Sequence, residues 1–294
     1  EFVQDVIELL RPLAVVRRMW PMTLQMPTGT VRIPKLTAGS AASYIGENTN
    51  ITKTQPTFGQ VTLTFKKLAA LVPVSNDLMR YSTPGADNIV RNDLVRAMAQ
   101  REDQAFLRDD GTNSTPKGLR FWAPAGNILT MTGTDVLADI TTDLGRLIQK
   151  LKDANVPMSN PAWIMAPRVK NYLVTLQNSQ GIFVYKDEMA QGTLWGYPFA
   201  VTTGIPTNLD FTGADTDDES EVYFVDIDQC LIGEGETMSI EASREAAYHD
   251  GSAVQSAWSR DETVVRAIAE HDFVLRYDKA VAVLAGVDWA PGSV

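Results

Sequence analysis

The sequence predicts an α+β fold in which both ends of the chain build one domain and a second domain is inserted between them. Segments with strand patterns lie at residues 28–74 and 262–287, near the two ends. Long segments with helical periodicity lie at 87–108 and 135–153, and the region 125–255 mixes helices with short strands. The 294 residues suffice for about two domains.

Composition and charge are those of a globular protein. Hydrophobic residues make up 44% of the chain and charged residues 21%, so a core can form. The formal net charge of −10 is the wrong sign for a dedicated DNA-binding protein, which needs a basic surface. No apolar run approaches the ~18–20 residues of a membrane span. The single cysteine, Cys230, has no intramolecular disulfide partner, and we expect a buried thiol.

The first 27 residues are predicted to be an extended arm. They are apolar, include Trp20, and are interrupted by prolines, so they have too little local structure to bury themselves and need another surface. The chain starts at Glu1 and not at a methionine, which agrees either with truncation or with proteolytic removal of an upstream segment.

Residues 37–60 are predicted to be the tip of a long hairpin. They are polar and lie between a strand at 28–36 and an alternating strand at 61–66. A two-stranded hairpin is marginal in water, so its apolar side chains are expected to contact a neighbouring molecule. A disordered or folded-back surface loop is the alternative. The apolar residues concerned are Tyr44, Ile45, Ile51 and Phe58.

The remaining elements follow from periodicity and from turn residues. Asp87 is a plausible cap for the helix at 87–108, and Pro167 suits the first turn of a helix that follows a buried strand at 162–165. Residues 195–203 and 221–232 are predicted to be strands, with a loop at 204–220 between them.

Few residues offer catalytic or metal-binding chemistry. The two histidines, His249 and His271, are expected at a turn and at a strand end. Asp226 and Asp228 would share one face of a strand, as the carboxylates of a hydrolase could, although a solvent-facing or ion-paired role is the simpler interpretation. The acidic run at 215–221 lacks the spacing of a calcium loop and is interpreted as solvated.

Short motifs recur along nearly the whole chain in an order that resembles the HK97-type major capsid proteins of tailed bacteriophages. No single motif is specific, but their order and spacing are. They are Tyr44–Glu47, Phe58–Leu63, Lys66–Ala70, Val74–Leu78, Asp103–Leu107, Asp110–Gly111, Pro116–Leu119, Trp163–Pro167, Leu194–Pro198 and Tyr223–Asp226.

The resemblance implies an HK97-like capsid fold with an N-terminal arm (1–27), a P-domain (28–124 and 256–294) and an inserted A-domain (125–255). The P-domain would carry the E-loop (37–60) and a spine helix at about 87–108. Contacts between subunits would involve the arm and the E-loop. The residues assigned to them are Trp20, Tyr44, Ile45, Glu47, Ile51, Lys53 and Phe58.

The resemblance also implies a function in assembly and not in catalysis. The chain would be the mature form of a major capsid protein, without its scaffolding segment. It would form the hexamers and pentamers of an icosahedral shell around double-stranded DNA, without sequence-specific binding, cofactor, metal or membrane. Its partners would be other copies of itself, the portal, a maturation protease and decoration proteins. Assembly would take place in the host cytoplasm, and the product would be the virion.

Two alternatives and one departure from the family pattern remain. An encapsulin-type nanocompartment shell has the same fold, and a soluble hydrolase would use Asp226 and Asp228. Some family members cross-link an E-loop lysine to an asparagine of a neighbouring P-domain. Here Lys53 is the only lysine in 37–60, and no asparagine follows Asn208, so we predict that this chain forms no such cross-link.

Overall fold

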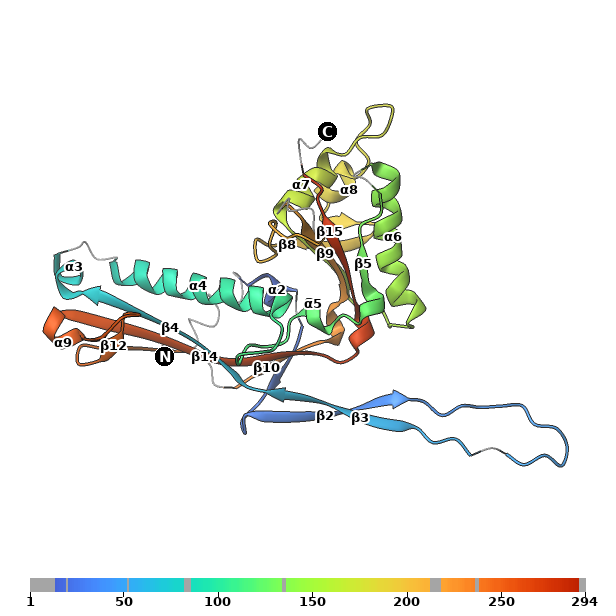
Figure 1. The fold of residues 1–294 in the computed structure, drawn as a ribbon, viewed down its shortest axis with the longest axis horizontal. Coiled ribbons are helices and arrows are strands. Elements are labelled where there is room, and N and C mark those ends of the chain that lie inside the picture. The colour runs from blue at the N-terminus through green and yellow to red at the C-terminus, as the bar shows by residue number, and fades with distance from the viewer. Residues whose placement is uncertain are drawn as a thin grey trace.

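The computed structural model describes residues 14–19, 21–51, 53–81, 86–133, 136–211, 218–235 and 238–290. Two β-sheets with their helices form the body of the molecule, and a long two-stranded hairpin projects from it (Figure 1). The predicted α+β class is confirmed. No helix in these ranges has the length and apolar character that crossing a membrane requires.

The first sheet has five strands and is organised around the long strand β14 (Glu262–Leu275). On one side β14 pairs with β4 (Lys66–Ser75), and on the other with β10 (Cys230–Glu234) and β11 (Ser239–Ser243), all antiparallel. An edge strand, β1 (Met22–Gln25), pairs in parallel with β10.

The long helix α4 (Ala86–Arg108) lies along this sheet and confirms the helix predicted at 87–108 (Figure 1). Its buried side chains Leu94 and Met98 pack with Ala267 of β14. Alternate residues of β4 face the helix, and Leu71 on the other face of that strand is 45% exposed. The sheet is therefore covered by α4 on one face, which agrees with the alternating burial of β4.

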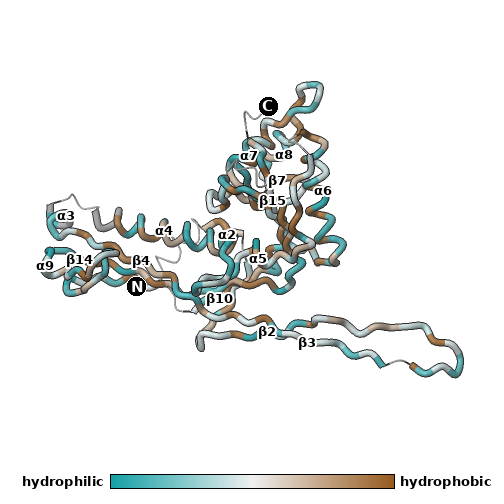
Figure 2. Tube along the Cα trace, in the orientation of Figure 1, coloured by the Kyte–Doolittle hydropathy of each residue, from teal (hydrophilic) through white to brown (hydrophobic). Residues whose placement is uncertain are grey.

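The second sheet has six strands in the order β5-β15-β9-β6-β8-β7. The apolar strand β15 is buried at every residue, and Figure 2 shows this apolar stretch within the sheet. Trp163 and Phe224 form an aromatic pair in its core, with ring centroids 4.3 Å apart. The strand bounds are β5 (Ile128–Thr130), β15 (Val281–Val287), β9 (Ser220–Asp226), β6 (Pro161–Met165), β8 (Tyr197–Val201) and β7 (Thr193–Leu194).

The longest helix of this second part, α6 (Leu137–Asp153), buries Ile140, Leu144 and Leu147 and confirms the helix predicted at 135–153. Helix α7 (Pro167–Thr175) begins at Pro167 as predicted. A 3₁₀ turn at Ile227–Gln229 divides the predicted strand 221–232 into β9 and β10, which belong to different sheets. The smaller elements are α2 (Val15–Arg18), α3 (Asn76–Tyr81), α5 (Leu119–Trp122), α8 (Lys186–Ala190), α9 (Ala257–Arg260), β12 (Ala247–His249) and β13 (Val254–Ser256).

The chain crosses between the two sheets at places other than the predicted limits of the inserted domain. Strands β10 and β11 fall within 125–255 but pair with β14 in the first sheet. Strand β15 falls within 256–294 but pairs with β5 and β9 in the second sheet. The reason is the composition of β15, since an entirely apolar run needs cover on both faces, which the second sheet provides.

The prediction that residues 1–27 need a foreign surface is wrong for residues 14–19 and 21–27, because these lie on the chain's own body. Val16 and Met26 are each 2% exposed, and β1 completes the edge of the first sheet. Residues 1–13 and Trp20 lie outside the described residues. The partners of this segment, β10 and α4, are distant in sequence, and local patterns gave no sign of them.

Candidate assembly surface

The projecting hairpin consists of β2 (Thr30–Ala38) and β3 (Thr57–Thr64). The strands pair antiparallel from Thr30 opposite Thr64 to Ala38 opposite Thr57, with a register shift between Leu36 and Ala38. Figure 1 shows the hairpin extending well beyond both sheets. The strands predicted at 28–36 and 61–66 are thus present, and the pairing continues further toward the tip.

The base of the hairpin is anchored in the body. Leu63 is fully buried, and Val61 and Leu63 pack with Met26 and with Val274 of β14. The amide of Thr64 donates a hydrogen bond of 2.8 Å to Asp272 Oδ2. Burial raises the pKa of Asp272 above its ordinary value, although the two backbone hydrogen bonds that it accepts oppose this. The base is therefore held by apolar packing together with a partly buried polar contact.

The tip, by contrast, is exposed throughout. Every described residue from 36 to 58 is exposed. The side chains of Ile51 and Phe58 are 80% and 71% exposed, and Tyr44 is fully exposed. Contacts within the tip are few and polar, such as the hydrogen bond of 3.0 Å from Thr54 Oγ1 to the carbonyl of Ala41. Exposed apolar side chains that gather in this way mark interaction surfaces.

Six of the seven residues predicted to contact other subunits lie together in this tip, and all six are exposed. They are Tyr44, Ile45, Glu47, Ile51, Lys53 and Phe58. The seventh, Trp20, lies outside the described residues, so the candidate surface is described for the tip. Contact of these residues with a neighbouring subunit stays a prediction.

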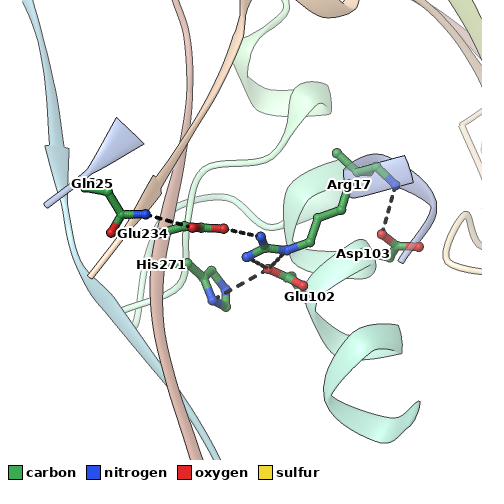
Figure 3. A network of polar contacts seen from close by, with 7 residues as sticks. Arg17, Gln25, Glu102, Asp103, Glu234 and His271 are labelled. Atoms are coloured by element: carbon green, nitrogen blue, oxygen red, sulfur yellow. Dashed lines mark hydrogen bonds and ion pairs between the residues drawn. The ribbon is translucent and has the colours of Figure 1, made fainter. Parts of the chain in front are cut away.

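A buried polar network, which sequence reasoning missed, joins the N-terminal segment to the first sheet (Figure 3). Arg17 of α2 bonds Glu102 of α4 at 2.7 Å and Glu234 of β10 at 2.5 Å. Asp103 accepts hydrogen bonds of 2.8 and 3.2 Å from the amides of Val15 and Val16. Burial raises the pKa of Asp103 to about 6, although these two hydrogen bonds oppose the shift.

A second ionic cluster joins the second sheet to helices α4 and α5. Glu221 of β9 is fully buried and lies 3.1 Å from Arg108 Nε and 2.7 Å from Arg120 Nε. It also accepts a hydrogen bond of 2.6 Å from the hydroxyl of Tyr223. Both guanidiniums lie over the ring of Phe211, at 5.9 and 5.7 Å from its centroid.

The interpretation of 215–221 as a solvated acidic run is therefore wrong at its C-terminal end, where Glu219 is 4% exposed and Glu221 is fully buried. Residues 215–217 lie outside the described residues. In the described part of the chain, no group of three or more potential ligands is placed to hold a metal ion.

The two carboxylates proposed for a hydrolase do not share a face. Asp226 is buried and accepts a hydrogen bond of 3.0 Å from the amide of Asn160, whereas Asp228 lies exposed in the 3₁₀ turn after β9. That expectation is wrong, because the strand ends at Asp226. His271 is not at a strand end either: it is buried within β14, and His249 is exposed at the end of β12. Cys230 is buried as expected, and burial raises the pKa of its thiol.

The chain matches the model of the phage capsid family over residues 1–286. It is 38% identical over 288 residues to the major capsid protein of Klebsiella oxytoca phage phiKO2. The alignment covers 96% of this chain and 66% of that protein. It is 25% identical over 299 residues to the capsid polyprotein of Pseudomonas phage PAJU2. That alignment covers 97% of this chain and 44% of the polyprotein. The chain thus spans 66% and 44% of the lengths of these relatives.

Solved structures share the fold at low sequence identity. A structure from Mycobacterium phage Adephagia has a TM-score of 0.74 at 16% identity and covers 93% of this chain and 89% of its own. The capsid of the native GTA particle has a TM-score of 0.73 at 15% identity and covers 94% and 90%. The resemblance inferred from the sequence motifs is confirmed. Because the family match covers nearly the whole chain, the protein belongs to the phage capsid family, which is a family of capsid proteins and not of enzymes.

Proposed function

We propose that this chain is the major capsid protein of a tailed bacteriophage and that the exposed hairpin tip binds a neighbouring copy in the shell. The observation that carries the proposal is the contrast within one hairpin: Leu63 at the base is fully buried, whereas Ile51 and Phe58 at the tip are 80% and 71% exposed. A hairpin with an anchored base and an apolar tip that the described residues leave uncovered is suited to binding another molecule.

The energies favour many contacts over one. Burying a large apolar side chain contributes about 1.5–3 kcal/mol, so the four apolar residues of the tip would contribute roughly 6–12 kcal/mol before costs. Association costs an estimated 4–15 kcal/mol in lost freedom. A single tip therefore gives a weak pair, whereas a closed ring of subunits repeats the contact at every position. A shell built from hexamers and pentamers would be stabilised in this way, by many repeats of a contact that is weak in a single pair.

The wider partners are part of the same proposal. The shell would enclose double-stranded DNA and would meet the portal, a maturation protease and decoration proteins during assembly in the host cytoplasm. The net charge of −10 supports a container that does not trap the DNA on its surface. The relatives and structures compared above include phages and a GTA particle, which favours a phage shell over an enzyme-filled nanocompartment.

Replacing two apolar residues of the tip tests the proposal. The double variant Ile51→Ser and Phe58→Ser should fold with its stability within about 0.5 kcal/mol of the unmodified chain, because both residues are exposed. Its assembly into capsomers or shells, measured by sedimentation and electron microscopy, should be lost or strongly reduced.

Two variants serve as controls. Val136→Ser changes an aliphatic residue that is 52% exposed outside the tip, and it should assemble normally. Leu63→Ser changes the buried base and should lower the stability of the chain itself. Normal shells from the double variant, or a solitary globule from the unmodified chain, would rule the proposal out.

A further inference from the structure

Two basic side chains share one carboxylate oxygen in the buried network of Figure 3. Arg17 Nη2 and Nε lie 2.7 and 2.9 Å from Glu102 Oε1, and His271 Nδ1 lies 3.7 Å from the same atom. Glu102 is 1% exposed, and its other oxygen, Oε2, has no hydrogen-bond partner among the described residues. A buried carboxylate in this position needs a cation, and two side chains are placed to supply it.

Arg17 belongs to a segment that is attached at the margin of the body. We call residues 14–19 and 21–26 the strap. The strap is held by the burial of Val16 and Met26, by the amide contacts of Val15 and Val16 to Asp103, by Arg17, and by the pairing of β1 with β10. Strand β1 lies at the edge of its sheet and, among the described strands, pairs only with β10. The strap can therefore separate without breaking any other strand pairing.

Removing the strap would leave Glu102 and Glu234 without their guanidinium. His271 lies opposite Glu234 in the pairing of β14 with β10 and is placed to replace it. The charged groups that act on His271 are Glu102, Arg17 and Glu234, and Lys66 lies opposite it on β4. The next lysine, Lys67, already pairs with Glu270 at 3.4 Å. His271 is thus the titratable group of this network that can gain a positive charge near neutral pH.

We propose that Arg17 and His271 are alternative cations for Glu102, so that release of the strap is coupled to the uptake of a proton by His271. In the docked state, Arg17 neutralises the carboxylate and the imidazole stays neutral. In the released state, the imidazole is protonated and takes the place of the guanidinium.

The direction of the pH dependence follows from which state binds the proton. Burial lowers the pKa of His271 in the docked state, and Arg17 adds to this, while Glu102 and Glu234 oppose it. Without the strap the imidazole gains solvent and loses the repulsion of Arg17, so its pKa rises. The released state then binds more protons, and docking weakens as the pH falls through the ordinary histidine value of 6.5.

Asp103 also titrates in this range. Burial raises its pKa to about 6 in the docked state, and the hydrogen bonds from the amides of Val15 and Val16 oppose this shift. Because Asp103 and His271 both change charge near pH 6, the variant Asp103→Asn is needed to isolate the effect of His271.

Hydrogen–deuterium exchange of the full chain tests the proposal. Protection of the amides in residues 15–25, corrected for intrinsic exchange, should fall between pH 7.5 and 6 by at most about tenfold per pH unit, the limit for one proton. Peptides from the buried strand β15 should show no such change. The variant Asp103→Asn should keep the pH dependence, and adding His271→Gln to it should remove the pH dependence. A flat profile for Asp103→Asn, or an unchanged slope when His271→Gln is added to it, would overturn the proposal.

The variant His271→Gln could fail to fold, because His271 packs edge-on against Phe106 with ring centroids 5.2 Å apart. A second measurement therefore leaves His271 in place. The chain has two histidines, so the titration of each imidazole can be followed by NMR, with the exposed His249 as an internal control. In Arg17→Gln the pKa of His271 should rise by about one unit or more, and that of His249 should not move. An unchanged His271 pKa in this variant would also overturn the proposal.

Discussion

At the scale of single residues, Glu221 links the second sheet to helices α4 and α5. It lies in β9 of the second sheet, and its partners Arg108 and Arg120 lie in α4 and α5. Glu221 is fully buried, whereas the side chains of Arg108 and Arg120 are 31% and 18% exposed. Solvent therefore reaches the cations but not the carboxylate, and the carboxylate depends on both of them.

Replacing Glu221 by glutamine should destabilise the folded chain. Breaking a buried ion pair costs about 3–5 kcal/mol, and the partial exposure of both arginines lowers our expectation to about 1–3 kcal/mol. Urea denaturation of the unassembled chain measures this. The matched variant Glu241→Gln removes a carboxylate from an ion pair with Arg266 in which both side chains are more than half exposed, and it should change the stability little. Equal effects of the two variants would contradict the role of Glu221.

Contacts of this kind were beyond prediction from the sequence. A carboxylate in an acidic run is ordinarily solvated, and Arg120 is distant from Glu221 along the chain, so no local pattern pairs them. The same holds for Gly118, where an added Cβ would lie 2.6 Å from the amide nitrogen of Arg108. The exposed residues of the hairpin tip were predictable, because their lack of local cover is itself a property of the sequence.

At the scale of elements, α6 begins without a side-chain cap. Its N-cap residue is Val136, which has the extended backbone of a cap, with φ −78° and ψ 151°, but no side-chain hydrogen bond. Valine is among the poorest residues at this position, because it cannot accept a hydrogen bond from the first turn. The helix is stabilised instead by the burial of Ile140, Leu144 and Leu147.

The variant Val136→Ser should therefore raise the free energy of unfolding, by about 0.5–2 kcal/mol. Thermal or urea denaturation measures the change. The matched variant Val136→Ala shortens the same exposed side chain without adding an oxygen, and it should bring no such gain. If both variants stabilise the chain equally, the cap is not the cause.

Strong periodicity made α6 predictable, a long stretch with few helix-breaking residues and a short apolar stripe made α4 predictable, and alternation made the hairpin predictable. Strand β1 was not, because four residues carry too little pattern and its partner β10 is distant in sequence. The strap was accordingly mistaken for an arm that lies on another subunit. Short elements that depend on distant partners are decided by tertiary packing, which a local pattern does not contain.

At the scale of the whole molecule, and of the shell that it is proposed to form, we expect contacts between subunits to be non-covalent. Lys53 is the only lysine in residues 37–60, and neither β14 nor β15 carries an asparagine that could accept it. Assembled shells that are denatured and run on a gel should give a single band of monomer. A ladder of multimers that disappears in Lys53→Arg would show that the lysine forms a cross-link after all.

The division into a domain built from both ends and an inserted domain stays a prediction, and the points where the chain changes sheet could not be placed from the sequence. β9 and β10 are nearly continuous in sequence and lie in different sheets, as do β14 and β15. The 3₁₀ turn Ile227–Gln229 separates β9 from β10, and residues 276–280, which include the 3₁₀ turn Asp278–Ala280, separate β14 from β15. A change of sheet within so short a stretch leaves no shift in composition.

This crossing of the chain has a consequence for biosynthesis. Strands β14 and β15 follow all their pairing partners along the chain, and each occupies an interior position in its sheet. On the ribosome, β4 and β9 therefore emerge long before the strands that complete them, and neither sheet can be completed until β14 and β15 have been synthesised. Until then the nascent polypeptide carries unpaired strand edges, and its body cannot present a finished surface to other copies.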